Sequence, residues 1–244
     1  MTLLLDVGNS RLKWAWLDGD GLRPGTPFPS RAVDLAGAFE AAWDALPRPV
    51  KICGCNVAGE EIRAAVETWA ARRWGCPCRW IVSTAEAYGV TNGYEDPARL
   101  GADRWLALIA ARRFFPLPLC VADCGTAVTV DALDADGRHL GGVIAPGLEA
   151  MRSALPLAVP MDAATAGAAP LGRNTVAAIG SGVLHAAAGL IGRVHAHCRT
   201  QWGQNPELIL TGGDAARIAA VLDIPHWVEA DLLLRGLAWL SNME

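Results

Sequence analysis

The sequence predicts an α/β protein made of two duplicated domains, each with a mixed β-sheet flanked by helices. Three observations support this fold class. Strand-like and helix-like segments alternate along the chain, each half opens on a strand, a D-x-G turn and a second strand, and an Asp/Gly-rich turn follows in each half. The 244 residues are enough for one large domain or two modest ones with well-formed cores.

The first half is expected to begin with the strand Thr2–Val7, a break at residues 8–10 and the strand Arg11–Leu17, in which polar and apolar residues alternate. Residues 18–21 (DGDG) then turn the chain as a hairpin. The elements expected next are a helix at Val33–Leu46, a strand at Lys51–Val57, a helix at Glu60–Trp74, a strand at Arg79–Val82 and a helix within Asp96–Phe115, with its body starting at Ala102.

The second half repeats this opening. The strand Leu119–Ala122 runs into the second D-x-G turn, and a second Asp/Gly turn separates the strands Val128–Leu133 and His139–Ala145. The remaining expected elements are a helix from Thr175 to about His197, a strand at Glu207–Leu210 that enters Thr211-Gly212-Gly213, and a last helix at Ala230–Leu240.

The two halves align with one gap. The D-x-G turns at residues 6–8 and 123–125 lie 117 residues apart, whereas the Asp/Gly turns, which include Asp20 and Asp136, lie 116 apart. Two spaced features in the same order indicate a duplication. The nearby prolines predict a boundary between a first domain at residues 1–116 and a second at residues 117–244.

Composition argues against several partners. The net charge of −4, from 21 basic and 25 acidic residues with no dense Lys/Arg run, predicts no nucleic-acid partner. Uninterrupted apolar stretches are shorter than the ~20 residues that span a bilayer, and Asp6 interrupts the apolar start, so we expect a cytoplasmic protein with no membrane partner. The seven cysteines are expected to be reduced thiols, with zinc at the pairs Cys53/Cys55 and Cys76/Cys78 as an alternative.

The two D-x-G turns have the parts of a phosphate-binding loop. Backbone N–H groups beside a glycine attract an anion, hydroxyl and amide side chains add donors, and the aspartate can hold a cation near that anion. One such turn is a frequent hairpin sequence, but two at the starts of duplicated domains indicate that they clamp the phosphates of one nucleotide. Thr211-Gly212-Gly213 is expected to approach the nucleoside closely. Neither a P-loop nor a dinucleotide fingerprint is present in the sequence.

In this order the motifs resemble the acetate and sugar kinase, Hsc70 and actin superfamily, and within it the type III pantothenate kinase family. The matching segments, which span nearly the whole chain, are DVGNSRLK at 6–13, YEDP at 94–97, LGADR at 100–104, DCGTAVT at 123–129, GGVIAPGL at 141–148, NT at 174–175 and TGG at 211–213. The resemblance implies two actin-like (ribonuclease H-like) domains and ATP-dependent phosphorylation of the primary hydroxyl of pantothenate, which gives 4'-phosphopantothenate in the first step of coenzyme A biosynthesis. Ser10 departs from the common threonine but keeps the hydroxyl.

The resemblance also implies the residues that handle pantothenate. Asp103 is expected to be the general base that accepts the hydroxyl proton, and the alternative is an aspartate favoured there only by the helix dipole. Arg104 is expected to bind pantothenate, and a guanidinium suits its carboxylate; the alternative is a solvated helix arginine. The implied substrate-binding residues are Tyr94, Gly101, Ala102, Asp103, Arg104 and Thr175.

On the nucleotide side, the resemblance implies an ATP site. Its residues are Asp6, Val7, Gly8, Asn9, Ser10, Arg11, Leu12, Lys13 and Thr126. Asp6 is expected to position a hydrated Mg²⁺ ion, and the resemblance assigns a monovalent cation, K⁺ or NH₄⁺, to Asp123. For both aspartates the alternative is hydrogen bonding to their own turn. The family further implies a homodimer.

Other interpretations stay open because a fold and its phosphate loops do not select the acceptor. A kinase of a sugar or amino sugar differs from the pantothenate interpretation only in the region of residues 101–104. A regulatory, actin-like nucleotide-binding protein is a second alternative, although 244 residues leave little room for the subdomains of filament formers. Among the ten tryptophans, Trp14, Trp16 and Trp105 are expected in packing rather than against a ligand.

Overall fold

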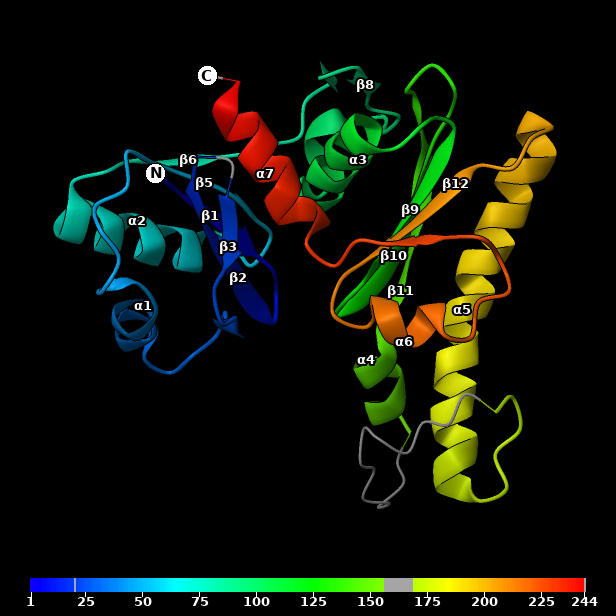
Figure 1. Cartoon of the computed structure of the whole chain (residues 1–244). Helices are drawn as coiled ribbons and strands as arrows, with labels where there is room; N and C mark the ends of the chain where they lie inside the picture. Colours follow the sequence, from blue (N-terminus) through cyan, green and yellow to red (C-terminus); the bar gives the residue numbers. More distant parts are fainter. Residues whose placement is uncertain (20, 156–168, 244) are drawn as a thin grey trace. The chain divides into compact units, whose positions relative to one another are not determined.

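The computed structural model describes residues 1–19, 21–155 and 169–243, so Asp20 of the first Asp/Gly turn lies outside the described residues (Figure 1). The chain forms two compact units. Unit 1 consists of Met1–Ala87, Tyr94–Arg113 and Leu232–Glu244, and unit 2 consists of Tyr88–Gly93 and Phe114–Asp231.

Unit 1 contains a mixed sheet with strand order β3-β2-β1-β5-β6. Its strands are β1 (Thr2–Val7), β2 (Arg11–Asp18), β3 (Gly21–Pro24), β5 (Lys51–Asn56) and β6 (Cys78–Trp80), and the short β4 (Phe28–Pro29) also pairs with β2. Strand β2 is antiparallel to β1 and β3, whereas β5 is parallel to β1 and β6. All six residues of β1 are buried, as expected for a central strand covered on both faces.

Helices cover both faces of this sheet. Helices α1 (Leu35–Trp43) and α2 (Glu60–Trp74) share a core with alternate residues of β1, Leu3, Leu5 and Val7. Helix α7 (Leu232–Asn242) contacts β1, β2 and β5 and packs on α3 (Ala102–Phe114), where a Cβ at Gly236 would lie 2.8 Å from the Ala110 side chain. Because successive side chains of a strand point to opposite faces of the sheet, the other β1 residues, including Asp6, point to the face opposite this core.

Aromatic rings fill the core between the sheet and the helices α1 and α2. Phe39 and Trp43 stack with their centroids 4.9 Å apart, and Trp69 and Trp74 meet edge to face at 4.8 Å. Such pairs contribute roughly 0.5–1.5 kcal/mol each beyond their buried area. The tryptophans expected in packing are buried, Trp14 and Trp16 in this core and Trp105 on α3, which confirms that expectation.

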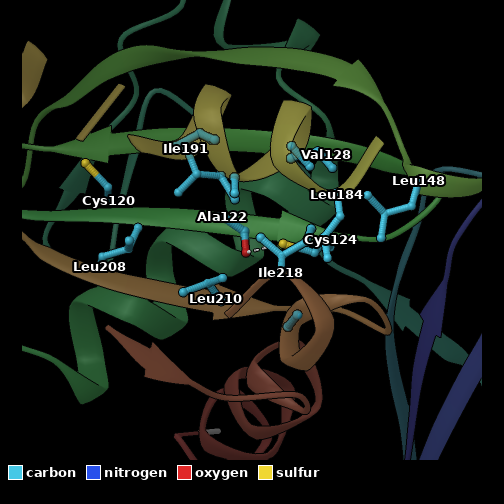
Figure 2. Packing of buried hydrophobic residues seen from close by; sticks show 14 of the residues in the cluster. Cys120, Ala122, Cys124, Val128, Leu148, Leu184, Ile191, Leu208, Leu210 and Ile218 are labelled. Carbon is cyan, nitrogen blue, oxygen red and sulfur yellow. Dashed lines mark hydrogen bonds between the residues drawn. The ribbon is translucent and has the colours of Figure 1, made fainter. Parts of the chain in front are cut away.

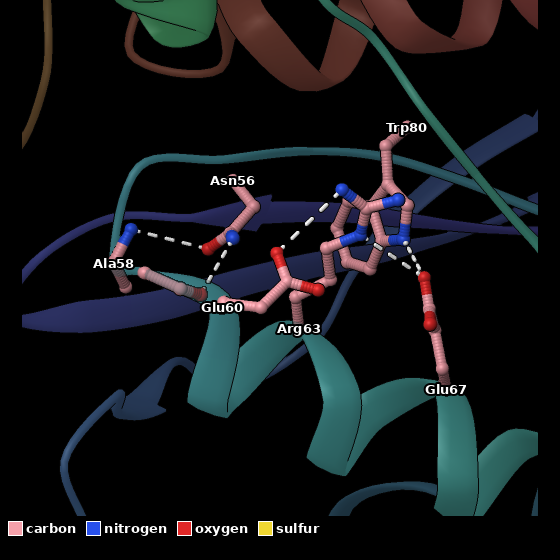
Figure 3. A network of polar contacts seen from close by, with 7 residues as sticks. Asn56, Ala58, Glu60, Arg63, Glu67 and Trp80 are labelled. Atoms are coloured by element: carbon pink, nitrogen blue, oxygen red, sulfur yellow. Dashed lines mark hydrogen bonds and ion pairs between the residues drawn. The ribbon is translucent and has the colours of Figure 1, made fainter.

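Polar contacts fasten the edge strand β6 to α2 (Figure 3). Glu67 accepts hydrogen bonds from the Trp80 indole at 2.7 Å and from Arg63 Nε at 3.1 Å, and the Arg63 guanidinium lies over the Trp80 ring at 6.0 Å from its centroid. At the start of α2, the Asn56 amide accepts from Ala58 N–H and donates to the Gly59 carbonyl. These contacts stabilise unit 1 and lie on a helix that carries none of the predicted site residues.

Unit 2 repeats the same sheet topology with strand order β11-β10-β9-β12-β13. Its elements are β9 (Leu119–Cys124), β10 (Ala127–Leu133), β11 (His139–Pro146), β12 (Glu207–Thr211), β13 (Trp227–Val228), α4 (Leu148–Ser153), α5 (Thr175–Trp202) and α6 (Ala215–Ala219). As in unit 1, the first two strands are antiparallel, and the fourth strand in the order lies parallel to the central one. Figure 2 shows the core of this unit, in which Leu184 and Ile191 of α5 pack over the buried residues of β9 and β12.

The single gap between the halves lies in the D-x-G turns themselves. In unit 1 the last pair before the turn is Val7 with Leu12, which leaves four turn residues. In unit 2 it is Cys124 with Val128, which leaves three. The change of offset from 117 to 116 therefore corresponds to one residue less in the second turn, and the common topology confirms the predicted class of two duplicated mixed-sheet domains.

The compact units differ from the predicted domains of 1–116 and 117–244 in three segments. The C-terminal segment with helix α7 belongs to unit 1, whereas Tyr88–Gly93 and residues 114–116 belong to unit 2. A linear boundary placed at prolines cannot show that a C-terminal helix returns to the first sheet, because that depends on packing with Leu106 and Ala110 of α3. The division at residues 116 and 117 stays a prediction.

Helix α5 is 28 residues long, five residues beyond the expected end near His197, and by length and composition it could cross a membrane. A core helix of a globular domain passes the same test, and Leu184, Ala188 and Ile191 of α5 are buried against the unit 2 sheet. The elements η1 (Pro97–Arg99), β7 (Glu86–Ala87) and β8 (Val90–Thr91) are too short to give a periodic signal in the sequence.

Candidate active site

The first D-x-G turn is a tight loop that exposes its polar residues. Gly8 N–H donates to the Arg11 carbonyl at 3.1 Å and closes the turn, while Asn9, Ser10 and Arg11 are exposed. The flanking Val7 and Leu12 have no exposed surface, because they belong to the core of unit 1. Val7 and Leu12 therefore anchor the turn in the core, and the exposed residues between them form the accessible loop. The expected part of these two residues in nucleotide binding stays a prediction.

A polar row crosses the sheet of unit 1 beside this loop. Asp6 pairs with Lys13 on β2 and with Cys55 on β5, and residues in register project from the same face of a sheet. The Cys55 thiol donates to Asp6 Oδ1 at 3.5 Å, and Cys55 itself is buried. The result is a Lys13–Asp6–Cys55 row in which a cation and a thiol flank one carboxylate.

Burial dominates the electrostatics of this row. Asp6 is 8% exposed, and burial raises the pKa of its carboxyl group; the positive charge of Lys13 and the Cys55 hydrogen bond oppose the rise, and the charge of Asp103 adds to it. Burial, followed by the charges of Asp6 and Asp103, also raises the pKa of the Cys55 thiol well above its ordinary value. Cys55 is thus a neutral hydrogen-bond donor, and a second carboxylate acts on the same cluster.

That second carboxylate, Asp103, lies in the first turn of α3. Its Oδ1 accepts from the backbone N–H of Arg104 at 2.7 Å, and Trp105 N–H donates to the Gly101 carbonyl as the helix begins. A Cβ at Gly101 would lie 2.6 Å from Asp103 Oδ1. The glycine of the GADR segment is therefore what leaves room for the carboxylate, and Ala102 is a small residue between them.

Arg104 is buried, in contrast to the alternative of a solvated helix arginine. It is 6% exposed, its Nη1 donates to the Tyr94 hydroxyl at 2.6 Å, and its guanidinium carbon lies 5.4 Å from the Tyr94 ring centroid. A buried guanidinium has lost most of its water, so anionic groups interact with it more strongly than with an exposed arginine. Tyr94 and Arg104 therefore form a hydrogen-bonded, stacked pair beside Asp103.

The second D-x-G turn carries a row of different chemistry. Asp123 pairs with Thr129 on β10 and with Thr211 on β12, so two hydroxyl groups flank this carboxylate on the same face of the sheet. Thr211 is 1% exposed, and its hydroxyl donates to the Ala230 carbonyl at 3.4 Å. Because that hydroxyl uses its proton in this bond, its lone pairs remain directed elsewhere.

The Thr-Gly-Gly segment closes on this second turn. Gly212 has φ +92°, and a Cβ there would lie 2.5 Å from both Asp123 Oδ1 and the Cys124 carbonyl oxygen. Asp214 N–H donates to the same carbonyl at 2.9 Å. Only glycine combines this positive φ with so close a contact to the second turn. The segment therefore packs directly against the Asp123 turn. Its expected role toward a nucleoside stays a prediction.

Two predicted residues of unit 2 are exposed. Thr126 lies in the second turn, and Thr175 begins α5 after Asn174, whose side chain accepts from Ala177 N–H at 2.8 Å as the helix cap. In unit 1 the structure brings together Asp6, Lys13, Asp103, Arg104 and Tyr94. Sequence reasoning missed Cys55, which was expected to be an ordinary thiol, because the strand register that brings it to Asp6 is a tertiary feature.

The two cysteine pairs meet different faces of the unit 1 sheet, although Cys53 lies near enough to Cys76 and Cys78 for their charges to interact. Cys53 and Cys55 pair with Leu4 and Asp6 of β1, whereas Cys76 and Cys78 contact the core on the opposite face. Within the described part of the chain no group of three or more His, Cys, Asp or Glu residues could hold a metal ion. Candidate cation sites are therefore the single aspartates with their oxygen-bearing neighbours.

Two repeated units with matching strand orders, β3-β2-β1-β5-β6 and β11-β10-β9-β12-β13, each with an aspartate near the end of its central strand, define an actin-like fold. Solved structures agree in fold: a Baf family protein from Campylobacter jejuni has a TM-score of 0.61 at 21% identity, covering 99% of this chain and 98% of that chain. A ROK family glucokinase from Streptomyces griseus has a TM-score of 0.54 at 13% identity, covering 100% and 99%.

Sequence comparisons identify the family within that class. The family described as type III pantothenate kinase matches residues 2–197. A type III pantothenate kinase of Methylibium petroleiphilum is 43% identical over 99% of this chain and 98% of the relative, and one of Acidovorax ebreus is 41% identical over 96% and 94%. The chain belongs to the type III pantothenate kinase family.

Proposed function

We propose that this chain is an ATP-dependent kinase that phosphorylates the primary hydroxyl of pantothenate to 4'-phosphopantothenate, the first step of coenzyme A biosynthesis. Membership of the family supports the reaction. The observation that carries it to particular residues is the cluster of Asp6, Lys13 and Asp103 beside the buried Arg104–Tyr94 pair. Phosphoryl transfer needs little more than an aligned hydroxyl, charge neutralisation at the phosphate and a proton acceptor.

Asp103 is the proposed general base. The pantothenate hydroxyl becomes more acidic as its bond to phosphorus forms, so a carboxylate can accept the proton. The Arg104 backbone N–H holds Asp103 Oδ1 in place, and Gly101 leaves space beside it. The dipole at the start of α3 favours the ionised carboxylate, the form that a base needs.

Arg104 is the proposed partner of the pantothenate carboxylate. Its guanidinium is oriented by the Tyr94 hydroxyl and ring, and a planar fork binds a carboxylate through two parallel hydrogen bonds. Arg104→Lys keeps the charge but loses the fork, so it should raise the pantothenate KM. An unchanged KM contradicts the carboxylate assignment. Ala102, Gly101 and Thr175 complete the proposed substrate site.

The first loop is the proposed site of Mg²⁺-ATP. The exposed Asn9, Ser10 and Arg11 offer donors to the phosphates, Lys13 neutralises charge, and Thr126 of the second loop adds a hydroxyl. A Mg²⁺ ion that keeps its waters would be held through Asp6, whose position beside Lys13 fits one carboxylate contact rather than a full protein cage. The ion supplies charge neutralisation at the phosphates when bound.

Asp123 is the proposed site of a monovalent cation, K⁺ or NH₄⁺. Its carboxylate lies against Gly212, and the hydroxyl-bearing Thr129 and Thr211 flank it in register. Oxygen ligands of this kind suit a hard cation. We further propose that the protein is a cytoplasmic homodimer with no nucleic-acid or membrane partner, as its family resemblance and its net charge of −4 indicate.

Coupled ADP release with ATP, Mg²⁺ and pantothenate, run beside a panel of sugars and amino sugars, tests this proposal. We expect turnover with pantothenate alone, and mass spectrometry of the product should show one phosphate on the primary hydroxyl. Turnover only with a sugar would support a kinase activity but reject pantothenate as the acceptor. Tight ATP binding without any turnover would favour a regulatory nucleotide-binding protein.

A further inference from the structure

In both units the last residue of the phosphate loop pairs with a proline on a neighbouring strand. Arg11, the last residue of the first loop, pairs with Pro29 on β4, and Ala127, the last residue of the second loop, pairs with Pro146 on β11. Ser30 follows the first proline and Gly147 follows the second. Ser30 and Gly147 therefore occupy equivalent positions in the two units, although the chain segments that bring them there differ in length.

Ser30 makes two hydrogen bonds to the first loop. Its backbone N–H donates to the Ser10 carbonyl at 3.1 Å, and its hydroxyl donates to the Gly8 carbonyl at 2.6 Å. The residue is 2% exposed. One buried serine thus holds two carbonyl groups of an otherwise exposed loop.

Gly147 makes the corresponding contact in the second unit. Its N–H donates to the Thr126 carbonyl at 3.0 Å, and Thr126 is the hydroxyl residue that corresponds to Ser10. A Cβ at Gly147 would lie 2.2 Å from the Gly125 carbonyl oxygen and 2.6 Å from that of Thr126. Gly147 has φ −69°, so close approach to the loop, rather than backbone conformation, is the reason for a glycine.

The hydrogen bonds from Ser30 and Gly147 to loop carbonyls determine the direction in which the neighbouring loop N–H groups point. In a trans peptide the carbonyl of one residue and the N–H of the next point in opposite directions. When Ser30 holds the Gly8 and Ser10 carbonyls, the N–H groups of Asn9 and Arg11 point away from it. Gly147 has the same effect on the N–H of Ala127. Amides directed in this way are the donors that a phosphate-binding loop presents.

We propose that Ser30 and Gly147 are equivalent positioning residues that hold the two phosphate loops with their amides directed at the phosphates of ATP. This inference rests on the proposed function, because it requires that the loops bind phosphate. Ser30 acts through the loop and does not itself contact the nucleotide. Its loss should weaken ATP binding and leave pantothenate binding unchanged.

Ser30→Ala, compared with Ser241→Ala, tests the first half of the proposal. Ser241 is a matched control, since it is also a buried serine of unit 1, is 3% exposed, and donates to a backbone carbonyl, that of Ala238, at 2.9 Å. The measurements are the Kd of a non-hydrolysable ATP analogue with Mg²⁺, the KM values of ATP and pantothenate, and urea unfolding. Ser30→Thr, which keeps the hydroxyl, is the rescue variant.

We expect Ser30→Ala to raise the analogue Kd and the ATP KM about fivefold to tenfold, as loss of a buried hydrogen bond predicts, with the pantothenate KM unchanged. Ser241→Ala should lower stability to a similar extent and leave the Kd unchanged. Equal Kd values for Ser30→Ala and wild type overturn the proposal while leaving the proposed function standing. A wild-type protein that does not bind the analogue overturns both, whereas analogue binding without pantothenate turnover removes the pantothenate function alone.

Gly147→Ala tests the second half. The added methyl group meets two backbone carbonyls of the loop, so the loop must move or the unit must loosen. We expect an analogue Kd raised at least as much as in Ser30→Ala, in protein that circular dichroism shows to be folded. A folded Gly147→Ala protein with wild-type affinity overturns the equivalence of the two residues. If the variant does not fold, Ser30→Ala alone decides the positioning role.

Discussion

The two aspartates at the penultimate positions of the central strands β1 and β9 are equivalent in the two units but have different neighbours. In unit 1, Asp6 lies between Lys13 and Cys55, and in unit 2, Asp123 lies between Thr129 and Thr211. The first row combines a carboxylate with a cation and a weak donor, and the second combines a carboxylate with two hydroxyl groups. The two units therefore share this geometry but differ in the neighbours of the aspartate. The proposal of Mg²⁺ at the first row and a monovalent cation at the second rests on the family resemblance, and this difference in neighbours supports it.

The turns differ along with the rows. The first has four residues, three of them exposed polar side chains, and the second has three residues and is closed by Gly212. A longer polar turn offers more donors to a phosphate, whereas a turn packed under a glycine holds its aspartate rigidly. Substitutions that change one member of either row at a time can separate the two roles.

Replacement of the proposed base should have the largest effect. Asp103→Asn keeps the size and hydrogen-bonding shape of the side chain but cannot accept the proton, so kcat should fall by about 10²- to 10⁴-fold. The pantothenate KM should change little, and circular dichroism should show an unchanged fold. A variant with near-normal kcat removes Asp103 from the mechanism.

Loss of the cation in the first row should come next. Lys13→Met keeps the length of the side chain but removes its charge, so kcat/KM for ATP should fall by roughly 10- to 100-fold, as the loss of one charged hydrogen bond predicts. Initial-rate kinetics at varied ATP concentration measure this change. Thr129→Val, at the matching position of unit 2, is the control, and it should alter cation dependence instead.

Removal of one hydroxyl from the second row should have a moderate effect. Thr211→Val preserves the shape of a buried side chain, and the loss of one oxygen ligand should raise the K⁺ concentration for half-maximal activity about fivefold. At saturating K⁺ the ATP KM should return to the wild-type value. A variant with an unchanged K⁺ requirement shows that Thr211 only fastens β12 to the Ala230 carbonyl.

The smallest effect concerns stability. Because burial raises the pKa of Asp6, the folded protein holds this proton to a higher pH than the unfolded chain does. The free energy of unfolding therefore falls as pH rises from the ordinary carboxyl pKa to the raised one, and it stays lower above that value. Asp6→Asn lacks this fall and should be more stable than wild type at neutral pH, while its activity is lost.

Urea unfolding of wild type and Asp6→Asn between about pH 4 and pH 7 measures the difference. The m value should stay constant, so that a shifted midpoint reports stability alone. A variant that is less stable than wild type at neutral pH would show that Lys13 and Cys55 compensate fully for the burial of the ionised carboxylate.

The sequence was sufficient for the parts of the fold that depend on local patterns. Local patterns predicted β1 and β2, with alternation in β2, and the helix expected at Glu60–Trp74 has the observed bounds of α2. The paired D-x-G turns indicated the duplication. These features need only neighbouring residues. The site was predicted where a motif is contiguous, as at residues 101–104, whose arrangement around Asp103 and Arg104 the structure describes.

The rest depends on register and long-range packing. Cys55, Thr211 and Ser30 reach the turns from strands or strand ends that are 20 to 88 residues away in the chain, as their contacts with Asp6, Asp123 and the first loop show. Nothing in a C-x-C pair predicts a thiol against a carboxylate. The burial of Arg104 likewise requires Tyr94, a residue outside its helix.

The most direct test of the account is a K⁺ titration of pantothenate-dependent ADP release by wild type and Asp123→Asn, with Na⁺ holding the ionic strength constant. Wild-type turnover should require K⁺, and Asp123→Asn should lose this activation while it still binds the Mg²⁺-ATP analogue. Turnover that is equal in K⁺ and Na⁺, and unaffected by Asp123→Asn, would contradict the division of roles between the two aspartates.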